Sequence, residues 1–114
     1  MHEVSLAEGI IEVVQNAARD AGAKRITSVR IAVGELSNVE IDALKFAFES
    51  VKRGTVADGA ALVIDRPEGR AWCMDCMKDV PLHRYGDACP SCGGYHLMPS
   101  EGRDLKVVDL ESED

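Results

Sequence analysis

The stretch Cys73-Met74-Asp75-Cys76 and its counterpart Cys89-Pro90-Ser91-Cys92 decide the fold of the C-terminal half of this chain. Twelve residues separate the two pairs, and the chain has four cysteines in all. Two C-x-x-C pairs joined by a short loop can direct four thiolates at one tetrahedral ion, which is the usual arrangement of a structural zinc site. Gly93 and Gly94 follow the second pair and give the backbone the freedom that a tight turn requires. The spacing therefore predicts a zinc ribbon with the ligands Cys73, Cys76, Cys89 and Cys92.

Two other uses of four cysteines compete with zinc. Disulfides stabilise small secreted proteins, but this chain starts with a polar segment that has no signal-peptide pattern. Iron is harder to set aside, because rubredoxin-like knuckles use the same thiolates. Few aromatic side chains are available to shield an iron centre, which favours zinc; they are Trp72, Tyr85 and Tyr95. An iron redox protein stays as an alternative that visible absorption would reveal.

The composition limits the class of protein. The chain has 114 residues and a formal net charge of −7, with 20 acidic residues against 13 Lys and Arg. This acidity argues against nucleic-acid binding, the first hypothesis for most zinc ribbons. No apolar run reaches the roughly 18 residues of a membrane span. We therefore expect a soluble cytoplasmic protein without nucleic-acid or membrane partners, in which a metal-held module supplements a small core.

Two amphipathic helices are expected before the cysteines. Ser5-Leu6-Ala7-Glu8 reads as a capping box that opens a helix from about residue 5 to 21, and Gly22 ends it. The apolar stripe of this helix consists of Leu6, Ile10, Val13, Val14, Ala17 and Ala21. A second capping box, Ser37-Asn38-Val39-Glu40, precedes another apolar stripe that ends at Gly54.

Three strands accompany these helices. Alternation of apolar and polar residues predicts strands over residues 26–33, 60–65 and 104–110. A helix joins the first two strands, so they can lie parallel through a right-handed crossover, and the last strand can pair antiparallel. The fold class is therefore α+β: two helices packed on a small three-stranded mixed sheet, with an inserted zinc-ribbon module.

The predicted domains follow from this order of elements. Residues 1–68 and 104–114 are expected to form an α/β domain, and residues 69–103 the zinc ribbon with its four cysteine ligands. Pro67 and Gly69, at the boundary, suit either a hinge or a fixed corner. Residues 111–114 are expected to be a short solvated acidic tail.

The N-terminus, Met1-His2-Glu3, is a candidate for a second metal site. The α-amine, the imidazole at position 2 and the deprotonated amide between them can close chelate rings around one ion in a plane of nitrogens. Nickel(II) and copper(II) favour that geometry, whereas zinc favours a tetrahedron. The metal and the nearby helix N-terminus both help the amine to lose its proton. By itself the pattern is not specific, because any protein can have histidine at position 2.

Several motifs together resemble one family. They are Met1-His2-Glu3 at the start, residues 33–39 (Val-Gly-Glu-Leu-Ser-Asn-Val), the two C-x-x-C pairs with Gly93 after the second, and residues 102–107 (Gly-Arg-Asp-Leu-Lys-Val). In combination they are similar to the HypA/HybF family of hydrogenase maturation factors, the nickel metallochaperones, over residues 1 to about 111.

The resemblance implies a function and a set of ligands. Members of the family insert nickel into the large subunit of [NiFe] hydrogenases, working with a partner GTPase. Their nickel site is built on the histidine after the initiator methionine, here His2, with the amine of Met1 and the backbone nitrogens of His2 and Glu3. The four cysteines hold structural zinc, and nickel is the transferred cargo. The family is not enzymatic, and no nucleophile with a base partner is apparent in this chain. The alternative is a zinc-ribbon interaction module without nickel delivery.

The predicted ribbon contains two histidines, His83 and His96. Some members carry histidine directly after a C-x-x-C pair, where this chain has Met77 and Gly93, and this argues against a pH-dependent exchange of zinc ligands. His96 is the candidate for an additional nickel ligand. His83 is expected to be solvated or hydrogen-bonded.

Several other side chains are expected to have structural roles. Glu3 and Glu40 are expected to act as helix-dipole or capping partners. Trp72 is expected to brace the zinc knuckle. The methionines near the cysteines are expected to pack against the ribbon and not to bind copper(I); they are Met74, Met77 and Met98.

Overall fold

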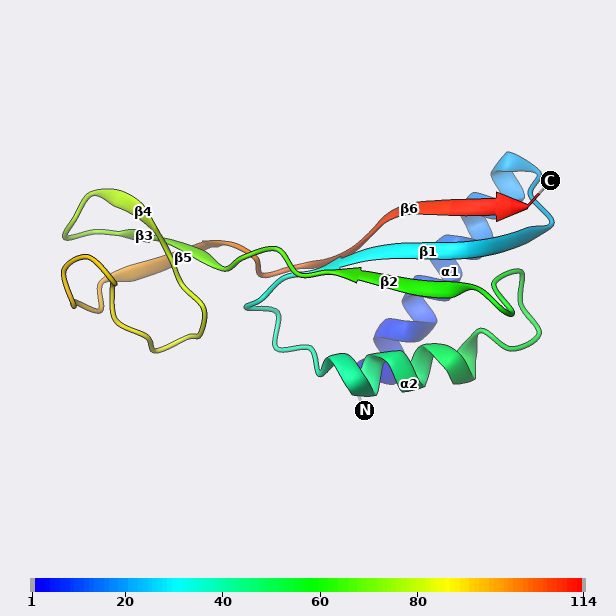
Figure 1. Ribbon diagram of the computed structural model, residues 1–114, viewed down its shortest axis with the longest axis horizontal. Helices are drawn as coiled ribbons and strands as arrows, with labels where there is room; N and C mark the ends of the chain where they lie inside the picture. The colour runs from blue at the N-terminus through cyan, green and yellow to red at the C-terminus, as the bar shows by residue number, and fades with distance from the viewer. Residues whose placement is uncertain (1, 114) are drawn as a thin grey trace. The chain divides into compact units, whose positions relative to one another are not determined.

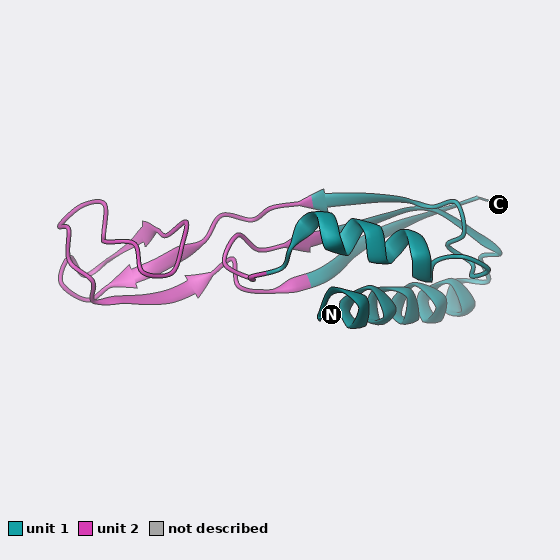
Figure 2. Cartoon of the chain, turned by 90° about the horizontal axis from the view of Figure 1, so that it is seen from below, with its two compact units in different colours: residues 1–31, 39–64, 106–114 teal, residues 32–38, 65–105 magenta. Residues whose placement is uncertain are grey.

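The chain forms two compact units in the computed structural model, which describes residues 2–113 (Figure 2). The first comprises Met1–Ile31, Val39–Ile64 and Lys106–Asp114, and the second comprises Ala32–Asn38 and Asp65–Leu105. The second unit thus contains the predicted ribbon and also takes in residues 32–38, from much earlier in the chain. Neither helix in the described part of the chain has the length and apolarity that a membrane span requires.

Two helices and a three-stranded sheet make up the first unit (Figure 1). Its elements are α1 (His2–Ala21), β1 (Arg25–Val33), α2 (Ile41–Val51), β2 (Ala61–Asp65) and β6 (Leu105–Glu113). The strand order is β2-β1-β6, and the arrows in Figure 1 show β1 and β2 running in one direction and β6 in the other. This mixed sheet, with α2 connecting the two parallel strands, confirms the predicted fold class.

The packing face of α1 differs from the prediction. Its buried side chains are Ala7, Ile10, Ile11, Val14 and Ala18. Val13 is 49% exposed and Ala17 is also exposed, so the predicted stripe is wrong by about one position around the helix. Apolar residues occupy both candidate faces of α1, and packing against the rest of the unit selects the one that is buried. The fully buried side chains of β1 and α2 complete this core; they are Val29, Ile31, Leu44 and Phe48.

Both predicted capping boxes are wrong. α1 begins at His2, before Ser5, and α2 begins at Ile41 after Glu40, whose side chain makes no capping hydrogen bond. At α2 a contact between the helices supplies the physical reason, because the carboxylate of Glu3 accepts the backbone N–H of Glu40 at 3.2 Å. Glu3 therefore acts as a capping partner as expected, but for the other helix. Ser37 Oγ is buried and has no hydrogen-bond partner among the described residues.

β6 continues through the predicted acidic tail. The strand runs to Glu113, so residues 111–113 are exposed as expected but belong to the sheet, while Asp114 lies outside the described residues. The Thr27 hydroxyl donates to the carbonyl of Glu111 at 3.3 Å, and Arg25 pairs with Glu113 at 3.5 Å. Opposite charges on neighbouring strands favour this extension of the sheet.

A second three-stranded sheet forms the ribbon. β3 (Arg70–Cys73) lies between β4 (Lys78–Pro81) and β5 (Leu97–Glu101), and both pairs are antiparallel. Its apolar interior consists of two small clusters: Leu36, Ala71 and Leu82, and Cys73, Val80 and Cys89. Leu97 packs against both. An interior of this size leaves much of the stability of the unit to be supplied by a bound metal.

Three glycines of the second unit bring separate backbone segments into direct contact. We call Gly34, Gly69 and Gly102 the glycine collar. A Cβ atom on Gly34 would lie 2.8 Å from the Cα of Gly102, and one on Gly102 would lie 2.7 Å from the Cα of Gly69. Two hydrogen bonds hold the contact: Gly34 N–H donates to Asp104 O at 2.8 Å, and Leu36 N–H donates to Gly102 O at 2.7 Å. Side chains at these positions would push the backbones apart.

Pro67 and Gly69 are hydrogen-bonded to other segments of the second unit. The carbonyl of Pro67 accepts the N–H of Glu35 at 2.9 Å. Gly69 donates its N–H to the Glu35 carboxylate at 2.9 Å and accepts the N–H of Leu82 at 2.8 Å. Since both polar groups of Gly69 are hydrogen-bonded, the backbone here is held in place from two sides.

Candidate metal centre

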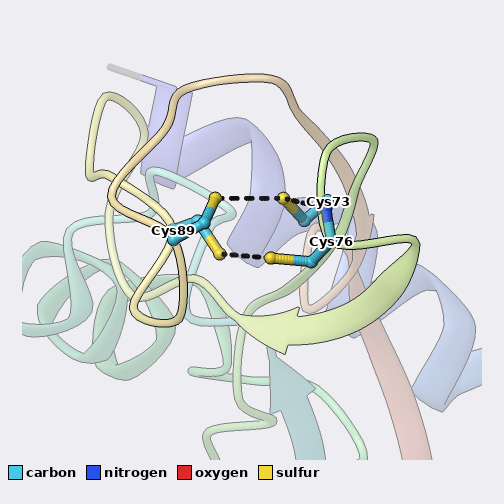
Figure 3. Close-up of side chains that lie close together, drawn as sticks. Cys73, Cys76 and Cys89 are labelled. Atoms are coloured by element: carbon cyan, nitrogen blue, oxygen red, sulfur yellow. Dashed lines mark hydrogen bonds between the residues drawn. The ribbon is translucent and has the colours of Figure 1, made fainter.

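The four predicted cysteines converge on one point in the ribbon (Figure 3). Their Sγ atoms all lie within 4.8 Å of one another, and the pairs Cys73–Cys92 and Cys76–Cys89 are each separated by 3.8 Å. A tetrahedral zinc ion with Zn–S bonds of about 2.3 Å needs sulfur separations of about 3.8 Å. A disulfide would need sulfurs at about 2.05 Å. The four sulfurs therefore fit a tetrahedral thiophilic ion, and zinc or iron satisfies this geometry.

Each C-x-x-C pair is held in the same backbone turn. Met77 N–H donates to Cys73 O, and Gly93 N–H donates to Cys89 O, both at 2.8 Å. The residue that closes each turn has a positive φ, 55° at Met77 and 74° at Gly93. Gly93 thus uses the freedom predicted for it, whereas Met77 adopts the conformation with a side chain, at a cost of about 1–2 kcal/mol. Two copies of one turn aim four sulfurs inward.

Backbone N–H groups point at two of these sulfurs and stabilise their thiolate form. The N–H groups of Cys76 and Ser91 point at the Sγ atoms of Cys73 and Cys89, each at 3.4 Å. The N–H groups of Cys92 and Ser91 lower the pKa of the Cys89 thiol to about 7. In contrast, the hydrogen bond with the Cys92 side chain and burial raise the pKa of Cys76 to about 12. Thiols this close resist ionising together, and a bound cation removes that resistance while protons are released.

The apolar side chains near the site are more exposed than predicted. Cys73 and Cys89 are buried and Cys92 is exposed. Residues alternate along β3, so Cys73 faces the interior while Trp72 is 40% exposed beside its β5 partner Met98. The bracing role of Trp72 stays a prediction. The prediction that the methionines pack against the ribbon is wrong, because all three are more than half exposed: Met74, Met77 and Met98.

Each histidine of the ribbon unit is paired with a carboxylate. His96 Nδ1 lies 3.0 Å from a carboxylate oxygen of Asp75, inside the first C-x-x-C pair. His83 Nδ1 lies 2.9 Å from Glu35, which hydrogen-bonds it as predicted. Sequence reasoning missed both partners, since Glu35 is 48 residues away from His83 and nothing local indicates the pairing. The Glu35 carboxylate raises the pKa of His83, and Gly69 N–H and His83 together lower the pKa of Glu35.

Two of the predicted nickel ligands, His2 and Glu3, lie at the start of α1. Met1 is outside the described residues. His2 is the first residue of α1, and its side chain is 66% exposed. The bond from Glu40 N–H lowers the pKa of Glu3 and fixes its carboxylate on the start of α2.

The sequence of this chain is similar to those of one protein family. The family model described as HypA, a hydrogenase/urease nickel incorporation metallochaperone, matches residues 1–112. Hydrogenase maturation factor HypA from Polaromonas naphthalenivorans (strain CJ2) is 49% identical over 110 residues, which cover 96% of each chain. The protein of the same name from Rhizobium leguminosarum bv. viciae is 50% identical over 111 residues, 97% of this chain and 98% of the relative.

Solved structures share the fold. The solution structure of the Ni metallochaperone HypA from Helicobacter pylori aligns with a TM-score of 0.69 at 22% identity, covering 96% of each chain. A second solution structure, of a HypA protein, aligns with a TM-score of 0.67 at 24% identity, covering 99% of this chain and 97% of the other. With a family model that matches almost the whole sequence and relatives of about half identity, this chain belongs to the HypA family of nickel-incorporation metallochaperones.

Proposed function

We propose that this chain binds Ni(II) at its N-terminus and delivers it, with a partner GTPase, to the large subunit of a [NiFe] hydrogenase in the cytoplasm. The observation that carries the proposal is the family match, which includes both Met1-His2-Glu3 and the four cysteines. The family description includes hydrogenase and urease. The relatives of about half identity are named hydrogenase maturation factors, and this favours a hydrogenase as the acceptor.

The proposed nickel ligands are the amine of Met1, the imidazole of His2 and the backbone nitrogens of His2 and Glu3. Four nitrogens in a plane suit Ni(II). The exposed His2 side chain supports this assignment. Glu3 contributes its backbone nitrogen only, because its carboxylate accepts Glu40 N–H. That bond ties Glu3, in the first turn of α1, to the start of α2.

His96 is the proposed additional nickel ligand. Its Nδ1 is hydrogen-bonded to Asp75, which leaves Nε2 as the ring nitrogen available to a metal. A carboxylate on one nitrogen of an imidazole fixes the ring and raises the basicity of the other nitrogen, as it does for many metal-binding histidines. The side chain of His96 is 74% exposed, so an incoming ion can reach it.

The four cysteines are proposed to hold structural zinc. Zinc in small thiolate modules binds with an apparent free energy on the order of 10–16 kcal/mol, so that ion folds the ribbon and stays. An exposed nitrogen site at the start of the chain exchanges its ion more readily. Residues 1–68 and 104–114 would then be the nickel-binding domain and residues 69–103 the zinc domain. Delivery under this proposal is ligand exchange, with no catalysed bond breaking.

A second candidate function is a zinc-ribbon interaction module without nickel delivery. The exposed side chains of Trp72 and Met98, which are cross-strand partners on β3 and β5, favour it. Exposed aromatic and methionine side chains are enriched at protein interfaces. The two candidates differ in one respect that can be measured, the transfer of nickel.

A transfer assay separates them. Zinc-loaded chain carrying radiolabelled nickel is mixed with the GTPase, GTP and the nickel-free large subunit of hydrogenase, and the label in the large subunit is counted. The proposal predicts that the label moves from the native chain and does not move from His2→Ala at the same protein concentration. Equal transfer from both chains would overturn the N-terminal nickel site, and no transfer from the native chain would favour the interaction module.

A further inference from the structure

The carboxylate of Glu35 joins three segments of the second unit. It accepts the backbone N–H of Gly69 at 2.9 Å and lies 2.9 and 3.1 Å from His83 Nδ1 through its two oxygens. Glu35 belongs to residues 32–38, Gly69 precedes β3, and His83 follows β4. We call this three-way contact the Glu35 clasp. Neither proposed metal site uses it.

We propose that the Glu35 clasp is a proton-sensitive device that holds residues 32–38 on the ribbon most strongly while His83 is protonated, and less strongly when His83 loses its proton. The inference goes beyond nickel delivery and does not depend on it.

The clasp lies beside the contacts that attach residues 32–38 to the rest of the unit. Leu36 follows Glu35 directly, is 3% exposed, and packs with Ala71 and Leu82. His83 follows Leu82 directly, so the ion pair and the Leu36 cluster are neighbours. The backbone of this segment is also bonded to Gly102 through Leu36 N–H. A weaker clasp should therefore be detected first in the backbone hydrogen bonds of Gly69 and Leu36.

The charges around His83 favour its protonated form. Glu35 and Glu68 line one cleft with His83, of about 440 Å³, and Asp87 lines a second cleft with it. Arg66 is the cation that shares the first cleft, and its guanidinium is bonded to backbone carbonyls, through Nε to Val33 O at 2.8 Å. Three carboxylates thus lie around one histidine, and the guanidinium in the first cleft is hydrogen-bonded to backbone carbonyls.

The direction of the pH dependence follows from these contacts. The hydrogen bond to Glu35 raises the pKa of His83 above its ordinary 6.5. A group whose pKa is raised by folding stabilises the fold fully below its unfolded pKa, and the stabilisation is lost as the pH rises through the raised value. At the acid end, Gly69 N–H and His83 lower the pKa of Glu35 below 4.5, so the carboxylate keeps its charge until the pH falls through that lowered value. The clasp is strongest between these two limits.

The test measures hydrogen exchange of individual backbone amides by NMR in the zinc-loaded chain, from about pH 5.5 to 8.5, the range in which histidine titrates. The ring signals of His83 are followed in the same samples. We expect the protection factor of Gly69 N–H to fall about two- to fivefold as His83 loses its proton, a range typical of an exposed charge pair. The midpoint of the fall should coincide with the midpoint of the His83 titration.

Two matched variants make the test specific. His83→Gln retains hydrogen-bonding capacity without a titratable group, and protection of Gly69 should then be independent of pH. His96→Gln removes the other carboxylate-paired histidine and should leave the pH dependence intact. Constant protection in the native chain, the same fall in His83→Gln, or loss of the fall in His96→Gln would each overturn the inference. Zinc content is measured in every sample, because a fall that accompanies zinc release would assign the effect to the cysteines and overturn it as well.

Discussion

Replacement of Gly34 by alanine is the sharpest test of the glycine collar. The new Cβ would lie 2.8 Å from the Cα of Gly102 and closer still to its carbonyl group. Carbon atoms pack at about 3.5–4.0 Å, so one backbone has to move by about 1 Å. That shift strains the two hydrogen bonds across the contact, from Gly34 N–H and Leu36 N–H, each worth about 1 kcal/mol. With about 1–3 kcal/mol for overpacking, Gly34→Ala should destabilise the second unit by about 3–5 kcal/mol.

The two units can be followed separately in a urea titration. Trp72 is the single tryptophan and lies in β3, so its fluorescence reports on the ribbon, whereas far-UV circular dichroism reports mainly on α1 and α2. With a urea m value of about 1–3 kcal/mol/M, the predicted loss lowers the fluorescence midpoint by at least about 1 M. The matched control is Gly9→Ala in α1, where a Cβ meets nothing within 4 Å and helix propensity adds about 1 kcal/mol of stability. A Gly34→Ala midpoint equal to that of the native chain would refute the collar.

Three further predictions concern the cysteine site, the contact of Glu3 with α2, and His96. Removal of the metal by a strong chelator should abolish the native fluorescence of Trp72 while the helical circular dichroism remains, because the ribbon has only a small apolar interior. Simultaneous loss of both signals would contradict this prediction. Glu3→Gln should lower the thermal stability of the first unit at neutral pH. Glu40 N–H lowers the pKa of Glu3, so the stabilisation that Glu3 provides is complete above pH 4.5 and disappears as the pH falls through the lowered value. The melting temperatures of the native chain and of Glu3→Gln should therefore converge in acid. A constant difference between them would exclude this mechanism. His96→Ala should weaken nickel binding in the complex with the GTPase, measured by isothermal titration, and unchanged affinity and transfer would remove His96 from the nickel ligands.

The cysteine cluster was predictable because its information is local. The spacing within each C-x-x-C pair forces one backbone turn, and the short loop between the pairs brings the turns together. The order of helices and strands was predictable for a similar reason, since apolar periodicity and glycine punctuation are properties of neighbouring residues. These features led to the correct mixed sheet and to the four sulfurs within reach of one ion.

The features that could not be predicted from the sequence depend on contacts between distant residues. Glu3 caps α2 from α1, and no local pattern around Ser37 reveals that its hydroxyl has no hydrogen-bond partner within residues 2–113. The face of α1 is selected by its packing partners, so Val13 points outward although its spacing suits the core. The Glu35 clasp belongs to the same class, because a carboxylate in one loop and a histidine 48 residues later become neighbours only when the ribbon folds.

We propose that the N-terminus binds nickel while the cysteines bind zinc. The most direct measurement is a nickel titration of the untagged, zinc-loaded chain beside His2→Ala and beside a form with one residue added before Met1, with zinc content determined in each. The account predicts that the native chain binds about one nickel in a planar, nitrogen-rich site and that both changes abolish binding while zinc stays. Equal nickel binding by all three forms would contradict the account and would place the nickel site among the histidines and cysteines of the ribbon.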